Sequence, residues 1–168
     1  GKLPMGSIVR LSVKPQVAGE AGLPKHAVRS LRVTLDGAEG DYNRYRTRKL
    51  GGDRDQALLI VTQELLIALA ADGWPVQPGD LGENVTLSGI REEDLRPGVR
   101  LQMGEVSVAI TKPCNPCTEL YTLPYVGEER GAAFLAATSG RRGWYAKVLT
   151  PGEITAHSSV ALSSPAVA

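Results

Sequence analysis

The sequence contains little that would support a disulfide framework, an aromatic core or a membrane span. Its 168 residues include only two cysteines, two tryptophans, five tyrosines and one phenylalanine. Two cysteines are too few for the disulfide scaffolds of small secreted proteins. The longest apolar region, residues 57–71, is interrupted by Gln63 and Glu64 and is shorter than the roughly 20 apolar residues of a membrane-spanning helix. We therefore expect a core built mainly of valine, leucine, isoleucine and alanine.

Charge of a single sign is also missing. The 19 Lys and Arg residues face 18 Asp and Glu residues, which leaves a net charge of +1. A balance of this kind gives no reason to expect a nucleic acid or a membrane surface as partner. The first residues do not show the basic and then apolar pattern of a secretory signal. We expect a cytoplasmic protein with reduced thiols and with neither a nucleic-acid nor a membrane partner.

Turn-forming residues are abundant, with 19 glycines and 11 prolines, and this composition favours a turn-rich domain over a helical bundle. Alternating or wholly apolar runs predict strands at residues 7–14, 28–35, 57–61, 84–87, 99–103, 106–111, 144–149 and 154–162. Helices are predicted from an N-cap at Thr62 to residue 71, and over residues 128–138. Most strands follow one another without a helix between them. We therefore predict a mainly β (β-rich α+β) fold, a closed or partly open barrel of mixed strands with two or three peripheral helices.

The length fits one domain, which we place at residues 6–162. Residues 1–5 are then an N-terminal extension or were added for expression, and residues 163–168 form a loose tail without charge. Residues 39–55 have almost no apolar side chain and are predicted to form a long polar loop. Loops of this length in a domain are usually functional or disordered.

The segment Pro113-Cys114-Asn115-Pro116-Cys117 carries both thiols of the chain. Two thiols at this spacing can bind one metal ion or exchange as a redox pair. A structural zinc site needs four ligands, and a thioredoxin-like dithiol belongs at the start of a helix in a βαβ unit. Cys114 and Cys117 can equally be ordinary loop cysteines. Alternatively, one of them is a solvent-facing thiolate that acts as a soft metal ligand or as a sulfur carrier.

Polar and basic residues in two glycine-rich loops could bind a polar or anionic ligand. Glu83 and Asn84 follow the turn-forming residues 78–82, and Asn offers both hydrogen-bond donors and acceptors. Arginine binds phosphate through a bidentate pair of hydrogen bonds. Lys and Arg residues occur in the loop at residues 41–54, at residues 141–142 and after Pro24. These candidates include Arg44, Arg46, Arg48, Lys49, Arg54, Arg141, Arg142 and Lys25. An ordinary tight turn and a solvated charged loop explain the same residues structurally.

In order and spacing, these segments resemble a MOSC domain, the module found at the C-terminus of molybdenum-cofactor sulfurases and as small stand-alone bacterial proteins. The resemblance extends from about residue 7 to residue 162. The segments that carry it share glycines at turns and a polar or thiol group beside them. They are residues 22–25, 37–41, 51–57, 78–85 with Gly89, 98–104, 113–117, and 143–148 with Gly152.

The resemblance implies a β-barrel of the pyruvate-kinase-barrel type that binds the molybdenum cofactor or carries sulfur for metal–sulfur centres. Cys117 matches the family's characteristic cysteine, which would serve as the catalytic thiol and as the metal ligand or hold a persulfide. Cys114 is not part of that pattern. Asn84 matches the family's Gly-Glu-Asn motif, Lys25 a basic position near the pterin phosphate, and Thr62 a hydroxyl residue before a helix. The complete set of expected cofactor-binding residues is Lys25, Arg44, Arg54, Thr62, Glu83, Asn84 and Arg141.

The activity that this resemblance implies is the reduction of N-hydroxylated compounds, or sulfur carriage, with a redox or sulfur-donor protein as partner. Pyridoxal phosphate, which belongs to the sulfurases, is not expected to bind to this domain itself. The chain departs from the family at His157-Ser158, where relatives have Gly-Asp, and it has no counterpart of the helical C-terminal region of relatives that reduce hydroxylamino-purines. The alternative is therefore a non-catalytic binding or adaptor module that has kept the MOSC fold without the cofactor.

Overall fold

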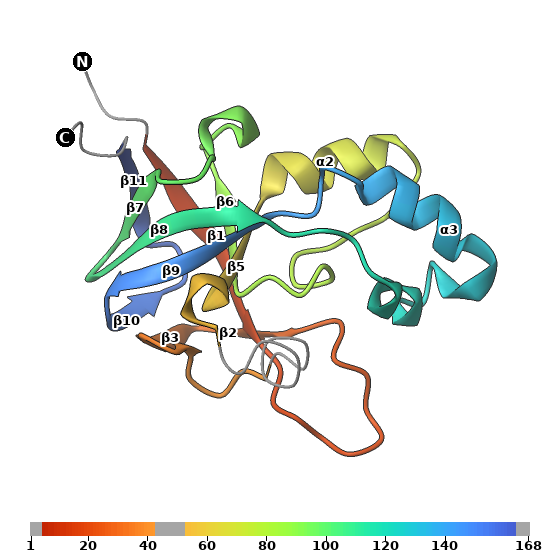
Figure 1. Cartoon of the computed structure of the whole chain (residues 1–168), viewed down its shortest axis with the longest axis horizontal. Helices are drawn as coiled ribbons and strands as arrows, with labels where there is room; N and C mark the ends of the chain where they lie inside the picture. Colours follow the sequence, from red (N-terminus) through yellow and green to blue (C-terminus); the bar gives the residue numbers. More distant parts are fainter. Residues whose placement is uncertain (1–4, 43–52, 164–168) are drawn as a thin grey trace.

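The computed structural model describes residues 5–42 and 53–163, and these form a β-barrel with helices packed beside it (Figure 1). The main sheet has the strand order β11-β7-β8-β9-β5-β6-β1-β2, and it closes because β11 also pairs with β1. The strands of this sheet are β1 (Met5–Val13), β2 (His26–Val28), β5 (Leu58–Thr62), β6 (Val85–Ser88), β7 (Arg100–Met103), β8 (Val106–Pro113), β9 (Trp144–Thr150) and β11 (Ser159–Ser163). A second, three-stranded sheet consists of β3 (Ser30–Thr34), β4 (Gly37–Ala38) and β10 (Gly152–Thr155).

The barrel is mixed because one strand pair is parallel. β5 and β6 run parallel, with Ile60 opposite Val85, whereas the other pairs in the described residues are antiparallel. Parallel neighbours need a crossover connection, and helix α2 (Gln63–Ala71) lies in the segment that joins these two strands. The predicted β-rich barrel of mixed strands is confirmed.

Two of the predicted strands are each divided in the structure. The expected strand at residues 28–35 breaks at Arg29 between β2 and β3, and the expected strand at residues 154–162 breaks between β10 and β11. The two breaks face each other, because the backbone N–H of Ala156 donates to the carbonyl of Arg29 over 2.9 Å. The prediction of single strands was wrong since alternation reports which face is buried, not which strand is the partner.

The buried side chains form two clusters. The barrel interior is aliphatic, with Ile8, Leu11, Ile60 and Leu101 among its members. The second cluster lies between the barrel and the helices and contains Phe134, Trp74 and Leu69. The ring centroids of Trp74 and Phe134 are 4.9 Å apart. The scarce aromatic residues thus attach the helices, and the barrel itself is filled by the residue types expected from composition.

Helix α2 begins where the sequence predicted, because the Thr62 hydroxyl accepts from the N–H of Leu65 over 3.1 Å. The second helix, α3 (Gly127–Thr138), also matches its prediction. Three short 3₁₀ helices complete the described elements: η1 (Arg54–Gln56), η2 (Glu92–Asp94) and η3 (Thr118–Thr122). Across the described residues, no helix is both long and apolar enough to cross a membrane.

Candidate functional site

The two cysteines lie on the segment between β8 and η3, and they differ in exposure. Cys114 is buried and Cys117 is exposed. The N–H of Cys114 donates to the carbonyl of Gly143 over 2.9 Å, and its thiol lies 3.3 Å from the Tyr145 hydroxyl. Because both contacts are to β9 or the residue before it, the loop is held against the barrel at Cys114. Cys117 then extends from this anchored point toward solvent.

A buried polar network brings together residues from three distant segments. The Lys25 ammonium lies 2.7 Å from Asp41 Oδ2, and the two side chains are 7% and 9% exposed. The Asn84 amide donates to the same Asp41 oxygen over 2.9 Å and to the carbonyl of Ser12 over 3.3 Å, and its Oδ1 accepts from the N–H of Leu59 over 3.2 Å. The amide group of Asn84 therefore makes its hydrogen bonds within the protein. It positions Asp41, which in turn forms the ion pair with Lys25.

The glycine-rich turn before β6 holds the backbone of Lys25. The N–H of Lys25 donates to the carbonyl of Gly79 over 3.0 Å, and Arg10 Nη2 donates to the carbonyl of Lys25 over 3.0 Å. Gly79 has a φ of 89°, and a Cβ atom there would lie 2.8 Å from the Lys25 carbonyl oxygen. Only glycine fits this approach without displacement, so the turn residues 78–82 help to place the cation.

Glu83 and Arg142 are buried charged residues that each keep one polar atom without a partner. Glu83 Oε2 accepts from the Thr86 hydroxyl over 2.9 Å, whereas Glu83 Oε1 and Arg142 Nε have no hydrogen bond in the structure. Arg142 Nη1 donates to the carbonyl of Leu81. Burial raises the pKa of Glu83. Backbone hydrogen bonds, the hydrogen bond from Thr86 and the charge of Arg142 each lower that pKa, but by less than burial raises it. In the described part of the chain, Arg142 forms no ion pair.

The thiols and these two cations occupy one region. Burial raises the pKa of Cys114, while the charge of Arg142, the hydrogen bond with Tyr145 and the charge of Lys25 oppose that rise. The Arg142 charge also acts on Tyr145, whose pKa burial raises. The interaction between two charges weakens as the distance between them grows. The sequence-predicted residues Lys25, Glu83, Asn84 and Cys117 therefore belong to one neighbourhood, although they come from separate segments.

This neighbourhood combines positive charge, hydrogen-bonding groups and a thiol. Lys25 and Arg142 supply positive charge, the two unpartnered atoms supply one donor and one acceptor, and Cys117 supplies an exposed thiol. Among the described residues, no three His, Cys, Asp or Glu side chains are grouped closely enough to hold a metal ion by themselves. A metal at Cys117 would therefore need most of its ligands from another molecule.

The remaining predicted site residues lie elsewhere. Thr62 is fully buried and its hydroxyl also donates to Glu92 Oε2 over 2.7 Å. Arg54 pairs with Asp36 on the surface at 3.0 Å, and Arg141 pairs with Asp72 at 2.8 Å between the ends of the two helices. Arg44 lies outside the described residues. A cofactor contact by any of these four stays a prediction.

Asp41, Arg142 and Tyr145 were not among the predicted site residues. Arg142 had been noted beside Arg141 as a basic pair, but the sequence does not say which of two adjacent arginines points inward. The flanking glycines were a usable signal, because Gly143 is buried and packs directly on Ile60 and Val61. Asp41 stood in one of the segments that carried the family resemblance, but nothing in the sequence indicated its partner.

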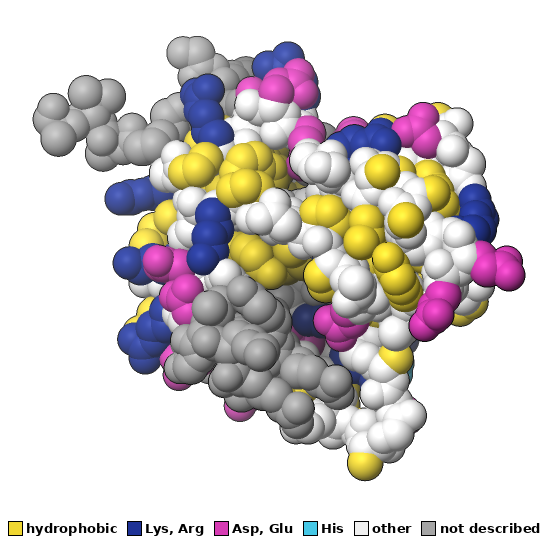
Figure 2. Space-filling model, turned by 45° about the vertical axis from the view of Figure 1, so that its right-hand side comes forward, with side chains coloured by type: hydrophobic (Ala, Val, Ile, Leu, Met, Phe, Trp, Pro, Cys, Tyr) yellow, Lys and Arg dark blue, Asp and Glu magenta, His cyan; other side chains and the backbone are white. Residues whose placement is uncertain are grey.

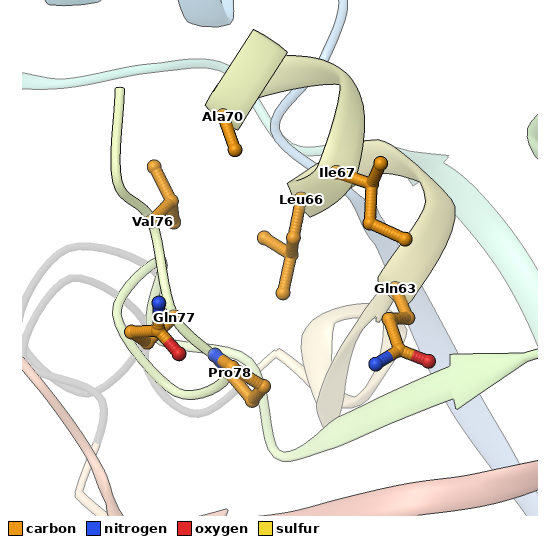
Figure 3. A pocket seen from close by; sticks show the side chains of 7 residues that line it. All are labelled: Gln63, Leu66, Ile67, Ala70, Val76, Gln77 and Pro78. Carbon is orange, nitrogen blue, oxygen red and sulfur yellow. The ribbon is translucent and has the colours of Figure 1, made fainter. Parts of the chain in front are cut away.

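The two clearest surface hollows flank α2 and contain neither cysteine. The first, of about 180 Å³, has no charged lining residue, and Leu66, Ile67 and Val76 line it (Figure 3). The second, of about 310 Å³, includes Glu92 and Arg141. On the face seen in Figure 2, apolar side chains form patches across the middle and right, and Lys and Arg side chains gather along the left. We assign the site by its chemistry rather than by these hollows, because neither combines a thiol with an unpaired cation.

We expect the stability of the protein relative to a Glu83→Gln variant to depend on pH. The folded-state pKa of Glu83 is raised above its ordinary value of 4.5. Below that value both folded and unfolded chains are protonated, whereas at higher pH the unfolded chain loses the proton more readily, so the wild type loses stability as pH rises. Melting temperatures of both proteins from pH 4 to pH 8 measure this. The gap in favour of the glutamine variant should widen with pH. A gap at residue 83 that does not change with pH would contradict the burial of this carboxyl.

Comparisons with known proteins agree with the fold and with the order of these motifs. A family model described as the MOSC domain matches residues 47–161. Protein YiiM of Escherichia coli K12 is 29% identical over 139 residues, a match that covers 80% of this chain. The chain spans 59% of the length of that relative.

Solved structures show the same architecture. The YUAD protein from Bacillus subtilis has a TM-score of 0.78 at 18% identity, and the match covers 96% of this chain and 97% of that one. YiiM from Geobacillus stearothermophilus has a TM-score of 0.72 at 25% identity, with 96% of this chain and 76% of that one covered. YiiM from Escherichia coli has a TM-score of 0.66 at 21% identity, with 96% and 72% covered.

Proposed function

The chain belongs to the MOSC domain family, and from this premise we propose that it binds the molybdenum cofactor through the thiolate of Cys117. The observation that carries the proposal is the position of that thiol. Cys117 is exposed, and it follows a loop anchored at Cys114, where the charges of Arg142 and Lys25 act. A soft ligand for a metal and cations for an anionic tail are therefore combined in one place.

The residues present fit such a cofactor. A pterin with a phosphate group needs positive charge, hydrogen-bond donors and acceptors, and one soft ligand for its metal. Arg142 Nε and Glu83 Oε1 are buried and lack partners, and a buried polar atom without a partner costs about 1–3 kcal/mol. A polar ligand that reached both atoms would remove that cost. The absence of a cluster of metal-binding side chains in the described residues is consistent with a metal that arrives with its own ligands.

The residues of this chain would divide the work of binding. Cys117 would hold the metal, and Lys25 and Arg142 would balance the negative charge of the phosphate. Asn84 and Asp41 act as positioning residues, because their hydrogen bonds hold the Lys25 ammonium in place. Burial raises the pKa of Glu83, and in its protonated form this carboxyl would donate as well as accept a hydrogen bond. Contacts from Arg44, Arg54, Thr62 and Arg141 stay predictions within this proposal.

The reaction that we propose is the reduction of N-hydroxylated compounds, with electrons from a partner protein. When bound, the cofactor supplies two-electron redox chemistry at its metal. The protein would orient the cofactor and tune the metal through the Cys117 thiolate. Sulfur carriage is a second candidate for the same site, and it is favoured by the exposure of Cys117, since an exposed thiol can accept sulfur from a donor protein.

The decisive experiment measures molybdenum and pterin in protein purified from a host that makes the cofactor. We expect about one molybdenum per wild-type chain and at least a ten-fold loss in Cys117→Ser, because serine is a hard and weak ligand for the metal. Cys114→Ser is the matched control and should keep the metal.

Metal retained by Cys117→Ser would contradict the assigned ligand. No metal in any of the three proteins, all folded by circular dichroism, would contradict cofactor binding. It would leave sulfur carriage or the cofactor-free adaptor module.

A further inference from the structure

Cys114 is a buried nucleophile that the proposed cofactor site does not use. It stands three residues before Cys117, is 5% exposed, and its thiol contacts the Tyr145 hydroxyl at 3.3 Å. A buried cysteine usually behaves as a small apolar side chain. This one instead lies beside a phenol and within reach of the charges of Arg142 and Lys25, surroundings that can stabilise a thiolate.

The two thiols differ in a way that suits consecutive roles. Burial raises the pKa of Cys114, so this thiol stays protonated at neutral pH and is shielded from reagents. Cys117 is exposed and is the thiol that a donor in solution reaches first. The two thiols stand three residues apart on one loop, and the charge of Cys117 adds to the rise in the pKa of Cys114. The buried thiol is therefore suited to act after the exposed thiol has been modified.

The segment between the thiols is short and is hydrogen-bonded at its two ends. In the described structure, the N–H groups of Asn115 and Cys117 make no backbone hydrogen bond, and the flanking bonds are those from Cys114 to Gly143 and from Leu120 to Cys117. The loop is therefore fixed at its two ends and not between them. A disulfide between the two cysteines would require their sulfur atoms to approach to about 2.05 Å.

We propose that Cys114 is the resolving thiol of Cys117, which releases sulfur carried there as a persulfide. The inference rests on the proposed function, in its sulfur-carrying form. The Cys114 sulfur attacks Sγ of Cys117, the bond between that atom and the terminal sulfur breaks, and the Cys114 proton leaves with the terminal sulfur as hydrogen sulfide. The terminal sulfur is reduced, and the two cysteines are oxidised to a disulfide. A dithiol reductant then returns both thiols with two electrons and two protons.

The roles of the neighbouring residues follow from their contacts. The Cys114 thiol donates to the Tyr145 oxygen at rest, and the phenol hydroxyl can rotate to donate to the thiolate that forms during attack. Arg142 and Lys25 stabilise the same negative charge, since both lower the pKa of Cys114 against the effect of burial. Tyr145 is therefore a positioning residue for the attacking sulfur.

The test uses the full-length chain, reduced, freed of reductant and treated with sodium polysulfide as the sulfur donor. Wild-type protein should release about one hydrogen sulfide per chain after loading and gain one intramolecular disulfide, seen by intact mass and by peptide mapping. Cys114→Ala should keep the persulfide on Cys117 and release sulfide at least ten-fold more slowly. Tyr145→Phe, which keeps the ring and is the milder variant, should slow release several-fold and shift its pH profile.

Three results would overturn the proposal: release by Cys114→Ala at the wild-type rate, a wild-type persulfide that persists without a disulfide, or no sulfur on Cys117 of Cys114→Ala. The outcome is independent of molybdenum. A protein that binds molybdenum through Cys117 but forms no disulfide refutes only this inference. A protein that resolves its persulfide but never holds the metal refutes only cofactor binding.

Discussion

Asp41→Ala is expected to lower the free energy of unfolding by about 3–5 kcal/mol, because removing one member of a buried ion pair leaves the other charge uncompensated. The pair with Lys25 spans 2.7 Å between side chains that are 7% and 9% exposed. The loss of stability should exceed that from breaking the ion pair alone. Asp41 also accepts hydrogen bonds from the Lys14 N–H at 2.9 Å and from the Asn84 amide at 2.9 Å. Urea denaturation followed by tryptophan fluorescence measures the change.

The matched control is an exposed ion pair in the same protein. Arg32 and Glu153 lie 3.2 Å apart with side chains 56% and 49% exposed, so Glu153→Ala should change stability by less than about 1 kcal/mol. A double-mutant cycle of Lys25→Met with Asp41→Ala should give a coupling of about 0.5–3 kcal/mol. An Asp41→Ala loss no greater than that of Glu153→Ala would show that the buried network does not support the fold.

Gly143→Ala is expected to lower the free energy of unfolding by about 2–5 kcal/mol, the sum of backbone strain and overpacking. Gly143 has a φ of 100°, which L side chains rarely adopt, and an added Cβ would lie 2.6 Å from Val61 Cγ2 and 2.7 Å from the Ile60 carbonyl oxygen. Ile60 and Val61 belong to the barrel strand β5, whose backbone is held by strands on both sides. The clash therefore cannot be relieved by moving a flexible side chain.

Gly140→Ala is the control that separates strain from the clash. Gly140 also has a positive φ, of 72°, but an added Cβ there meets no atom within 4 Å. Gly140→Ala should therefore lower the free energy of unfolding only through the strain of placing alanine at a positive φ, about 1–2 kcal/mol. Chemical denaturation of both variants under one condition compares them directly. Equal losses in the two variants would refute the close contact between Gly143 and β5, and with it the anchoring of the cysteine loop at this glycine.

Local patterns predicted the individual elements well where the sequence itself contains the cause. Thr62 before an apolar run predicted the start of α2, and its hydroxyl does cap Leu65. Strict alternation predicted the buried positions Leu31 and Val33 of β3. The division of residues 28–35 between two sheets was missed, because alternation continues across Arg29 although the hydrogen-bonding partner changes from β1 to β10.

The candidate site was predictable in part. Lys25, Glu83, Asn84 and Cys117 were chosen from separate motifs, and the structure brings their segments together. The choice between Arg141 and Arg142 was not accessible from residue type, since both are arginines beside glycines. The structure distinguishes them, because Arg141 Nη2 pairs with Asp72 at the surface, whereas Arg142 is 6% exposed and contacts the Leu81 carbonyl.

The sequence by itself determined the aliphatic barrel interior, the positions of both helices and the presence of a thiol loop beside glycine-rich turns, because composition, periodicity and capping act over a few residues. Tertiary structure alone decided that Lys25 pairs with Asp41, that Asn84 holds them, and that Cys114 is buried while Cys117 is exposed. These properties depend on which distant segments meet when the barrel closes through β1 and β11. Burial then raises the pKa of groups such as Glu83 and Cys114, since desolvation acts only once the surrounding segments have packed.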